Sequence, residues 1–225
     1  MEGDETLEAL LAHARALVGV ELGELADGLG LPVPSGLVRT KGWSGQILEQ
    51  ELGVSSAGTR GPDFAALGVE LKTVPVTVDA AGALAPIEST AVCQIDPVAI
   101  AAESWADSYV RRKLARVLFV ALEVPPGARS VGERRVAGVC LWSPDVEQER
   151  QLRADFELFA REYFRRGRAS AITGHLGVVM QVRPKGKNAA DTRDAYDERG
   201  EATRVGKHGF YLRPTFVAAI LAGAR

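Results

Sequence analysis

The sequence predicts an α/β fold in which helices flank a mixed central sheet. The first observation is that short segments rich in β-branched residues, such as Val69–Val76, alternate as strands do. The second is that segments with helical periodicity, such as Asp4–Val18, lie before and between them. The third is composition, because 225 residues with 46% hydrophobic and 25% charged side chains suit one globular domain, or one domain with two lobes.

Three helices are expected in the first quarter of the chain. Asp4–Val18 has an apolar stripe and acidic residues at its N-terminus, Glu21–Gly28 ends in glycine, and Trp43–Leu52 is followed by Gly53. Ser55–Pro62 is polar and contains glycine, so we expect a loop there.

Strands and helices alternate in the rest of the chain. Further strands are expected at Thr90–Ile95, Val117–Leu122, Val136–Trp142, His175–Arg183 and Gly209–Arg213. Further helices are expected at Glu103–Leu114, from Ser143 as N-cap with Pro144 at the first position to about Phe164, and at Pro214–Ala222. Residues 187–204 are polar and lack periodicity, which predicts a flexible loop.

The stretch Pro62–Lys72 places two carboxylates and one ammonium group where a β-hairpin would bring them together. Glu70 and Lys72 are two residues apart on the expected strand, so they share a face. The Leu67-Gly68 pair is typical of a turn, which would return Asp63 to their side. Two anionic oxygen donors suit a hard cation such as Mg²⁺, and a neighbouring lysine can orient water or help to deprotonate it. Phosphodiester hydrolysis requires such a set.

The pattern Pro-Asp, a short spacer and Glu-x-Lys resembles the signature of the PD-(D/E)xK nuclease superfamily. The same pattern also fits an edge strand whose solvated Glu and Lys prevent aggregation. The eleven residues by themselves leave both interpretations open.

Further motifs accompany this hairpin in a fixed order. They are the run that starts at Lys41, KGWSGQILEQELG, then DFAALGVELKT from Asp63, VRRKLARVL from Val110, LWSP from Leu141, RPK from Arg183 and GFYL from Gly209. The series resembles the MutH family of strand-nicking endonucleases of methyl-directed DNA mismatch repair, from about Leu7 to the last helix. The resemblance implies one restriction-endonuclease-like domain over residues 1–225, with two lobes around a DNA cleft. One lobe would hold the N-terminal helices and the catalytic hairpin, and the basic C-terminal half would read DNA.

The resemblance assigns catalytic roles residue by residue. Asp63 and Glu70 would bind the metal, and Lys72 would position or activate the water. Glu49 matches a further metal-site glutamate of the family, and it can border a cleft because it follows core-facing Leu48, whereas Glu51 would be a plain surface acid.

Lys113 is expected to approach the active site, because it lies in the family's Val-Arg-x-Lys-Leu segment. Without the resemblance it would be taken for a lysine on a helix surface.

DNA reading is expected in the basic half. Arg183, Pro184 and Lys185 match the loop with which the family reads GATC, and arginine commonly donates to guanine O6 and N7. Tyr211 matches a tyrosine that senses the adenine N6-methyl group, although by itself it suits a half-buried strand position.

Two further points concern the segments that would touch DNA. Lys41 and Gly42 match a DNA-contacting segment of the family.

The residues that follow Lys185, Gly-Lys-Asn, depart from the family pattern, which leaves the exact site preference open.

Charge is unevenly distributed along the chain. Residues 1–110 contain 5 Lys and Arg against 16 Asp and Glu, whereas residues 111–213 contain 21 against 13. The first part can supply metal ligands and the second can face phosphates. The net charge of −2 indicates weak non-specific DNA binding and favours recruitment by a partner. By resemblance, that partner is a MutL-type activator and, indirectly, a MutS-type protein.

We expect a cytoplasmic protein. No apolar run is long enough to cross a bilayer, and Met1 leads into acidic residues rather than into a signal peptide. Cys93 and Cys140 lie in apolar surroundings, so both are expected to be buried, reduced thiols.

The function expected is that of a Mg²⁺-dependent endonuclease that nicks the unmethylated strand at hemimethylated GATC sites; Mn²⁺ or Ca²⁺ can substitute in binding. The nearest alternative is a GATC-specific type II restriction endonuclease, which must cut both strands, usually as a dimer. One compact chain of this length favours a nicking monomer. The other alternative is a catalytically silent DNA-binding module, which the presence of Asp63, Glu70 and Lys72 disfavours.

Overall fold

The computed structural model describes residues 6–35, 42–54 and 61–223, and the chain forms two compact units. Unit 1 comprises Met1–Glu88, Ala115–Ser143 and Val217–Arg225, and unit 2 comprises Ser89–Leu114 and Pro144–Phe216. Each unit has its own sheet and its own core. The chain therefore passes from one unit to the other four times.

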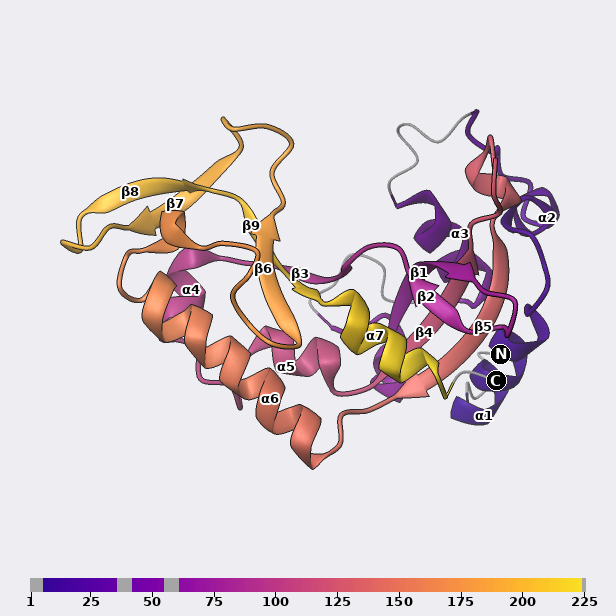
Figure 1. The fold of residues 1–225 in the computed structure, drawn as a ribbon, viewed down its shortest axis with the longest axis horizontal. Helices are drawn as coiled ribbons and strands as arrows, with labels where there is room; N and C mark the ends of the chain where they lie inside the picture. The colour runs from indigo at the N-terminus through magenta and orange to yellow at the C-terminus, as the bar shows by residue number, and fades with distance from the viewer. Residues whose placement is uncertain (1–5, 36–41, 55–60, 224–225) are drawn as a thin grey trace. The chain divides into compact units, whose positions relative to one another are not determined.

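Unit 1 is built on a four-stranded mixed sheet with the order β2-β1-β4-β5 (Figure 1). The strands are β1 (Glu70–Val78), β2 (Leu84–Pro86), β4 (Val117–Glu123) and β5 (Arg135–Trp142). β1 and β4 are parallel, and the other neighbouring pairs are antiparallel. Parallel neighbours need a long crossover, which here includes the first segment of unit 2.

Helices α1 (Leu7–Ala16), α2 (Leu22–Gly28) and α3 (Trp43–Glu51) pack on one face of this sheet. Their apolar side chains share a core with Leu118 and Leu122 of β4. A short 3-10 turn, η2 (Val131–Glu133), precedes β5.

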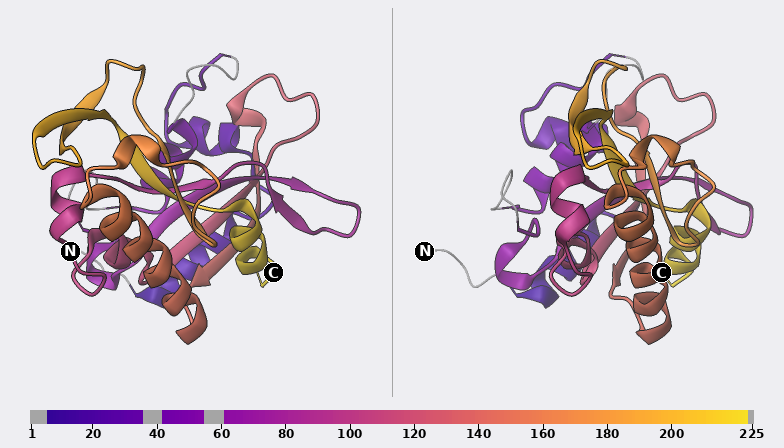
Figure 2. Two further views of the ribbon diagram at one scale, coloured as in Figure 1. Left: turned by 60° about the vertical axis from the view of Figure 1, so that its left-hand side comes forward. Right: turned by 90° about the vertical axis from the view of Figure 1, so that its left-hand side faces the viewer.

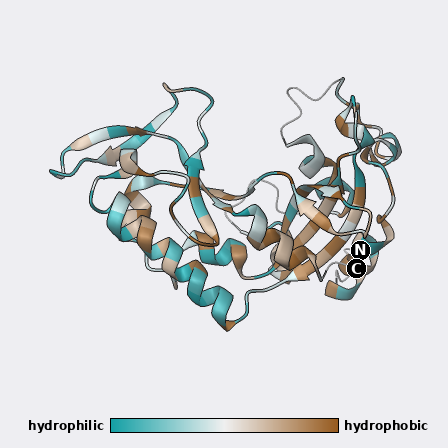
Figure 3. Cartoon of the chain, in the orientation of Figure 1, coloured by the Kyte–Doolittle hydropathy of each residue, from teal (hydrophilic) through white to brown (hydrophobic). Residues whose placement is uncertain are grey.

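The opposite face of the same sheet is also covered. The Phe119 ring lies 5.9 Å from the Trp142 ring, and Cys140 Sγ lies 3.7 Å from the carbonyl oxygen of Ile220 in α7 (Pro214–Leu221). Burial on both faces explains why β4 is apolar at six consecutive positions, which appear brown in Figure 3.

Unit 2 contains a three-stranded antiparallel sheet, β3-β9-β6, and a separate two-stranded hairpin, β7–β8. The strands are β3 (Thr90–Gln94), β6 (Met180–Pro184), β7 (Thr192–Tyr196), β8 (Ala202–Gly206) and β9 (His208–Leu212). The helical segments are α4 (Pro97–Ala102), α5 (Tyr109–Leu114), α6 (Val146–Glu157), the π-helical η3 (Leu158–Phe164) that continues α6, and η4 (Ala169–Ala171).

Aromatic rings fill the core of unit 2. The Phe156 ring lies 5.4 Å from Trp105 and 6.0 Å from Phe210, and the Phe159 ring lies 5.9 Å from Phe210. These contacts attach α6 and η3 to the β3-β9-β6 sheet, beside which α6 lies in Figure 2.

A buried carboxylate joins α6 to the start of β6. Asp155, which is 3% exposed, accepts hydrogen bonds from the backbone N–H groups of Val178 (2.9 Å), Val179 (2.8 Å) and Met180 (2.8 Å). The Arg213 guanidinium fixes the preceding residues by donating to the carbonyls of Gly174, Leu176 and Gly177. Side chains, rather than a sheet ladder, therefore hold this segment.

The expected class, α/β with a mixed central sheet flanked by helices, is confirmed. The strands β1, β3, β4 and β5 and the helices α2, α3 and α7 lie close to their expected bounds. The expected start of the first helix, Asp4, is outside the described residues. The described helix begins at Leu7, where the Thr6 hydroxyl oxygen accepts a bond from Ala9 N (3.1 Å).

The helix expected at Glu103–Leu114 is wrong in its first half. Residues 103–108 are not helical, and α5 begins only after Ser108, whose hydroxyl oxygen accepts from Arg111 N (3.1 Å). The unexpected helix α4 begins after Asp96, whose carboxylate accepts from Val98 N and Ala99 N. Both starts use side-chain caps.

The expected N-cap at Ser143 is wrong by two residues. Asp145 caps α6, because its carboxylate accepts from Gln148 N (2.8 Å) while the Gln148 side chain accepts from Asp145 N (3.1 Å). This reciprocal pair is a capping box.

The flexible loop expected at residues 187–204 is also wrong, because it contains β7 and most of β8. Their turn is held by Asp197, whose Oδ1 accepts from the N–H groups of Arg199 and Glu201 (both 2.8 Å). The strand expected from His175 begins only at Met180.

Two expectations concerned the whole chain. Neither cysteine forms a disulfide, but only Cys93 is buried, whereas Cys140 is half-buried. Within residues 6–35, 42–54 and 61–223, no helix combines the length and the apolar character that crossing a membrane requires.

Candidate active site

A tight hairpin brings Asp63 to the start of β1. Phe64 and Val69 form an antiparallel bridge, with Phe64 N donating to Val69 O (2.9 Å) and Val69 N donating to Phe64 O (3.2 Å). The turn between them consists of η1 (Ala65–Leu67) and Gly68, whose φ of 63° favours glycine. The next pair outward from the bridge is Asp63 and Glu70, which therefore lie opposite one another.

Local hydrogen bonds orient the two carboxylates. Asp63 Oδ2 accepts from the backbone N–H of Leu71 at 2.8 Å, which fixes this side chain against β1. Lys72 Nζ donates to Glu70 Oε1 at 2.6 Å, so Glu70 and Lys72 share a face of the strand, as expected. Glu70 as a residue is 2% exposed. The Lys72–Glu70 bond is charge-assisted, and such hydrogen bonds are stronger than those between neutral groups. The hairpin thus gathers two acids and one lysine.

The interpretation as a solvated edge strand is wrong. Glu70 and Lys72 pair with Val117 and Phe119 of β4, and β2 flanks the same strand only near its far end, at residues 76–78. The Glu70 side chain is only 3% exposed. A buried acid cannot act as a solvated charge that protects a sheet edge from aggregation, and acids are rarely buried unless they are paired.

The donor set at Asp63 and Glu70 fits a hard divalent cation. In the described part of the chain, no three side chains of His, Cys, Asp or Glu are grouped so that they could hold a metal ion. A closed structural zinc site needs four ligands, whereas Mg²⁺ keeps several waters and takes one or two carboxylates together with substrate phosphates. Two carboxylates at one hairpin are therefore better suited to binding Mg²⁺ than to forming a closed zinc site.

Glu49 lies on α3, which packs against β1, and it is half-buried. Among the described residues, no group of three acidic side chains is arranged to hold a metal ion, so Glu49 does not form one with Asp63 and Glu70. A role for Glu49 as a further metal ligand stays a prediction.

Gly42 immediately precedes α3, and Lys41 lies outside the described residues. Gly42 is exposed and has a φ of 90°, in the left-handed region. A Cβ at Gly42 would meet no heavy atom of the described residues within 4 Å, so the conformation of Gly42 is what favours glycine there.

We expect Gly42→Ala to lower the free energy of unfolding by about 1 kcal/mol, since a left-handed conformation is strained for a residue with a Cβ. Gly45→Ala is the matched control. Gly45 lies inside α3, and a Cβ there would make only an ordinary contact, 3.8 Å from Glu49 Oε1. It should therefore raise stability by up to about 1 kcal/mol. Urea unfolding of both variants checks the opposite signs, and equal effects would contradict this account of Gly42.

Unit 2 brings four of the expected DNA-reading residues to the β6–β9 pair. Lys185 Nζ lies 5.6 Å from the centre of the Tyr211 ring, and Arg183 Nη1 donates to the hydroxyl of Ser89 at 3.3 Å. Arg183 and Pro184 are exposed, and Pro184 is opposite His208 in the strand register. These residues thus gather on one sheet of unit 2, and their contact with DNA stays a prediction.

Lys113 is more buried than its position on a short helix would suggest. The residue is 8% exposed, and its Nζ lies 5.6 Å from the centre of the Tyr109 ring. It therefore differs from an ordinary helix-surface lysine. It belongs to unit 2, and its approach to the carboxylates stays a prediction.

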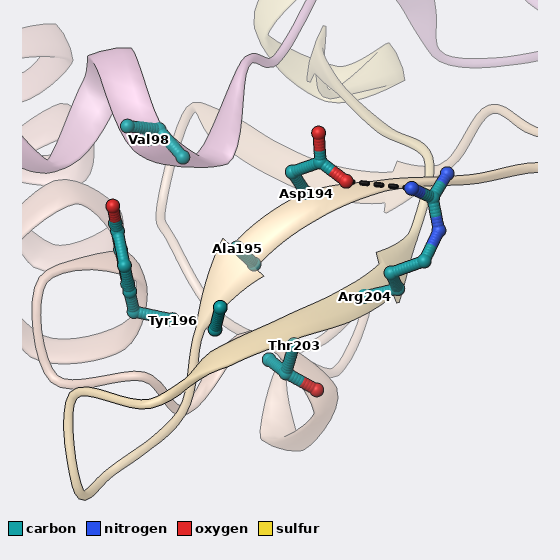
Figure 4. Close-up of a pocket in the computed structure, with 7 residues that line it drawn as sticks. Val98, Asp194, Ala195, Tyr196, Thr203 and Arg204 are labelled. Carbon is teal, nitrogen blue, oxygen red and sulfur yellow. Dashed lines mark hydrogen bonds and ion pairs between the residues drawn. The ribbon is translucent and has the colours of Figure 1, made fainter.

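A hollow of about 240 Å³ lies between α4 and the β7–β8 hairpin, and Figure 4 shows the residues that line it. The side chains of Val98 and Tyr196 border it, and Arg204 Nη1 donates to Asp194 Oδ1 at 2.6 Å. An exposed ring and one ion pair supply neither a paired set of metal ligands nor a nucleophile with its base. The chemistry therefore points to the Asp63 hairpin instead.

The chain is similar to known DNA repair proteins. Residues 52–155 match the family model described as "DNA mismatch repair enzyme MutH". The "DNA mismatch repair protein MutH" of Klebsiella pneumoniae subsp. pneumoniae is 44% identical over 220 residues, which cover 97% of this chain and 92% of the relative. The protein of the same name from Escherichia coli is also 44% identical over 220 residues, 97% of this chain and 93% of its own. The chain therefore belongs to the MutH family of DNA mismatch repair endonucleases.

Proposed function

We propose that this endonuclease depends on Mg²⁺ and nicks the unmethylated strand at hemimethylated GATC sites. The observation that carries the proposal is the hairpin that joins Asp63, Glu70 and Lys72. It supplies the two acids and the lysine that phosphodiester hydrolysis needs, in a chain of this family.

Asp63 and Glu70 would hold the ion, and Glu49 would complete the metal site. When bound, Mg²⁺ lowers the pKa of water and neutralises charge that develops on the phosphate. The Lys72 ammonium would orient the attacking water, and its 2.6 Å bond to Glu70 supports this role. The water attacks phosphorus in line with the departing sugar 3′-oxygen, and Lys113 would support the site from α5.

Reading of the site would fall to Arg183, Pro184 and Lys185, with Lys41 and Gly42 touching the DNA near the cleft. Arginine can donate to guanine O6 and N7, and this bidentate contact is the commonest specific one. Arg183 supports the assignment because its guanidinium is exposed at the end of β6 and is already held on one side by Ser89.

A partner would bring the enzyme to its site. The net charge of −2 gives little non-specific attraction to DNA, so we propose activation by a MutL-type protein and indirect coupling to a MutS-type protein. We propose that the enzyme works as a monomer in the cytoplasm.

A plasmid-nicking assay tests the proposal. The substrates carry one GATC site that is unmethylated, hemimethylated or fully methylated, and each is incubated with Mg²⁺ or with EDTA. We expect nicks only with Mg²⁺ and none on the fully methylated plasmid. Linear product from both strands would favour a restriction enzyme, and binding without any nick would favour a silent DNA-binding module.

Tyr211→Ser is expected to narrow the rate difference between unmethylated and methylated strands. The half-buried ring can pack against a base edge and be crowded by an added methyl group, and serine leaves that space empty. Removal of one such contact changes discrimination by roughly tenfold. Tyr196→Ser is the control, because Tyr196 is a 53% exposed tyrosine on β7. An unchanged ratio in Tyr211→Ser would remove Tyr211 from methyl sensing.

A further inference from the structure

Three residues of unit 2 that carry no expected role support the expected DNA-reading residues. They are Ser89, which directly precedes β3, Gln181 of β6 and Gly209 of β9. On β6, Gln181 and Arg183 are two apart and share a face, and their partners on β9 are Tyr211 and Gly209. The supporting and reading residues therefore interleave on one face of the sheet.

The Ser89 hydroxyl oxygen accepts two hydrogen bonds on this face. Gln181 Nε2 donates to it at 2.7 Å, and Arg183 Nη1 donates at 3.3 Å. A hydroxyl oxygen has two lone pairs, and these two bonds use both. Gln181 is only 5% exposed, so its side-chain amide is held in place. The amide in turn orients the Ser89 hydroxyl, which accepts the hydrogen bond from the exposed Arg183.

Gly209 provides the space in which Lys185 reaches Tyr211. A Cβ on Gly209 would lie 2.8 Å from Lys185 Cδ and 3.3 Å from Tyr211 Cε2. It would also lie 2.9 Å from the carbonyl oxygen of Cys93 on β3. Real Cβ atoms do not approach so closely, so a side chain here would displace the lysine stem. A glycine inside a strand commonly marks such a close approach.

We propose that Ser89 and Gly209 are positioning residues for sequence reading: Ser89 aims Arg183, and Gly209 sets the Lys185–Tyr211 pair. Neither belongs to the hairpin that carries Asp63 and Glu70, so they govern which site is cut rather than the chemical step. The inference rests on the proposed function, because it assumes that Arg183, Lys185 and Tyr211 meet the bases.

The first test compares Ser89→Ala with Ser89→Thr, which keeps the hydroxyl. Values of kcat and KM are measured on GATC duplexes and on duplexes with one altered base pair. Loss of a hydrogen bond to a charged group should lower kcat/KM on GATC by roughly tenfold, mainly through KM. Altered sites should lose less, so selectivity falls. Ser89→Thr should restore both quantities, and Ser170→Ala, at an exposed serine of η4, is the surface control.

The second test is Gly209→Ala, in which the new methyl group pushes on Lys185 and Tyr211. We expect the preference for unmethylated over methylated strands to fall several-fold. Its melting temperature is measured alongside, because the contact with the Cys93 carbonyl can also loosen the β3–β9 pair. If Gly209→Ala does not fold, the Ser89 variants decide the matter.

The outcomes separate this inference from the proposed function. Unchanged selectivity in Ser89→Ala, with a wild type that discriminates between sites, overturns the inference alone. A wild type that nicks all sites equally overturns the proposed function and this inference together. A rate loss in Ser89→Ala that is equal on every duplex and falls on kcat would mean a merely structural role, and it too would overturn the inference.

Discussion

Asp63→Asn and Glu70→Gln are each expected to lower the nicking rate by roughly a thousandfold or more. A bound cation stabilises the charge of the transition state by several kcal/mol, and each 1.4 kcal/mol of that stabilisation changes the rate by about a factor of ten. The amide substitutions remove a negative ligand while keeping the shape of the side chain. Asparagine still offers an oxygen to Leu71 N, and glutamine still offers one to Lys72 Nζ, so the hairpin should persist. Nicking is measured on a hemimethylated plasmid with Mg²⁺.

DNA binding by both variants should remain measurable, because the expected reading residues lie in unit 2 and are unchanged. Glu51→Gln is the matched control. Glu51 is an acid at the end of α3, and its Oε1 lies 3.1 Å from His13 Nε2. This control should nick at the wild-type rate. Undiminished nicking in either Asp63→Asn or Glu70→Gln would defeat the assignment of the active site.

Asp155→Ala should lower the free energy of unfolding by about 4 kcal/mol, because each buried donor that loses its acceptor costs on the order of 1–3 kcal/mol. The substitution removes the common acceptor of three backbone N–H groups at the start of β6. Urea unfolding measures the change, with unit 2 expected to lose structure first.

Asp194→Ala is the control for Asp155→Ala. Asp194 is likewise a hydrogen-bond acceptor, here from Arg204 at 2.6 Å, but its side chain is 82% exposed. Exposed ion pairs contribute less than about 1 kcal/mol, so stability should hardly change. A small effect of Asp155→Ala, comparable with that of the control, would show that the residues before β6 find other acceptors.

The candidate catalytic residues could be predicted from the sequence because their geometry is local. Strand periodicity places Glu70 and Lys72 on one face, and a turn at Gly68 returns Asp63 to the same strand. The same locality made β1, β4 and α3 predictable, since each has a clear apolar pattern or a glycine at its end.

The remaining errors have physical causes. The β7–β8 hairpin is exposed on both faces along most of its length, so it lacks the alternation that indicates a strand. The segment before β6 is held by Asp155 and Arg213, which are distant in sequence. The roles of Ser89 and Gly209 likewise depend on partners in other strands. The caps at Asp96 and Asp145 were local signals, but no helix had been expected after Asp96, and the helix after Asp145 had been expected to start at Ser143.

The fourfold passage of the chain between its two units limits how the protein can be divided. Neither unit is a continuous piece of sequence, so no single truncation yields one of them intact. The candidate catalytic hairpin shares its sheet with β4 and β5, which are synthesised only after the chain has entered and left unit 2. A nascent chain stopped before β5 therefore has its acids but only part of their scaffold, and catalytic competence should appear late in translation. A nuclease built in this way should not cut the chromosome as an incomplete product.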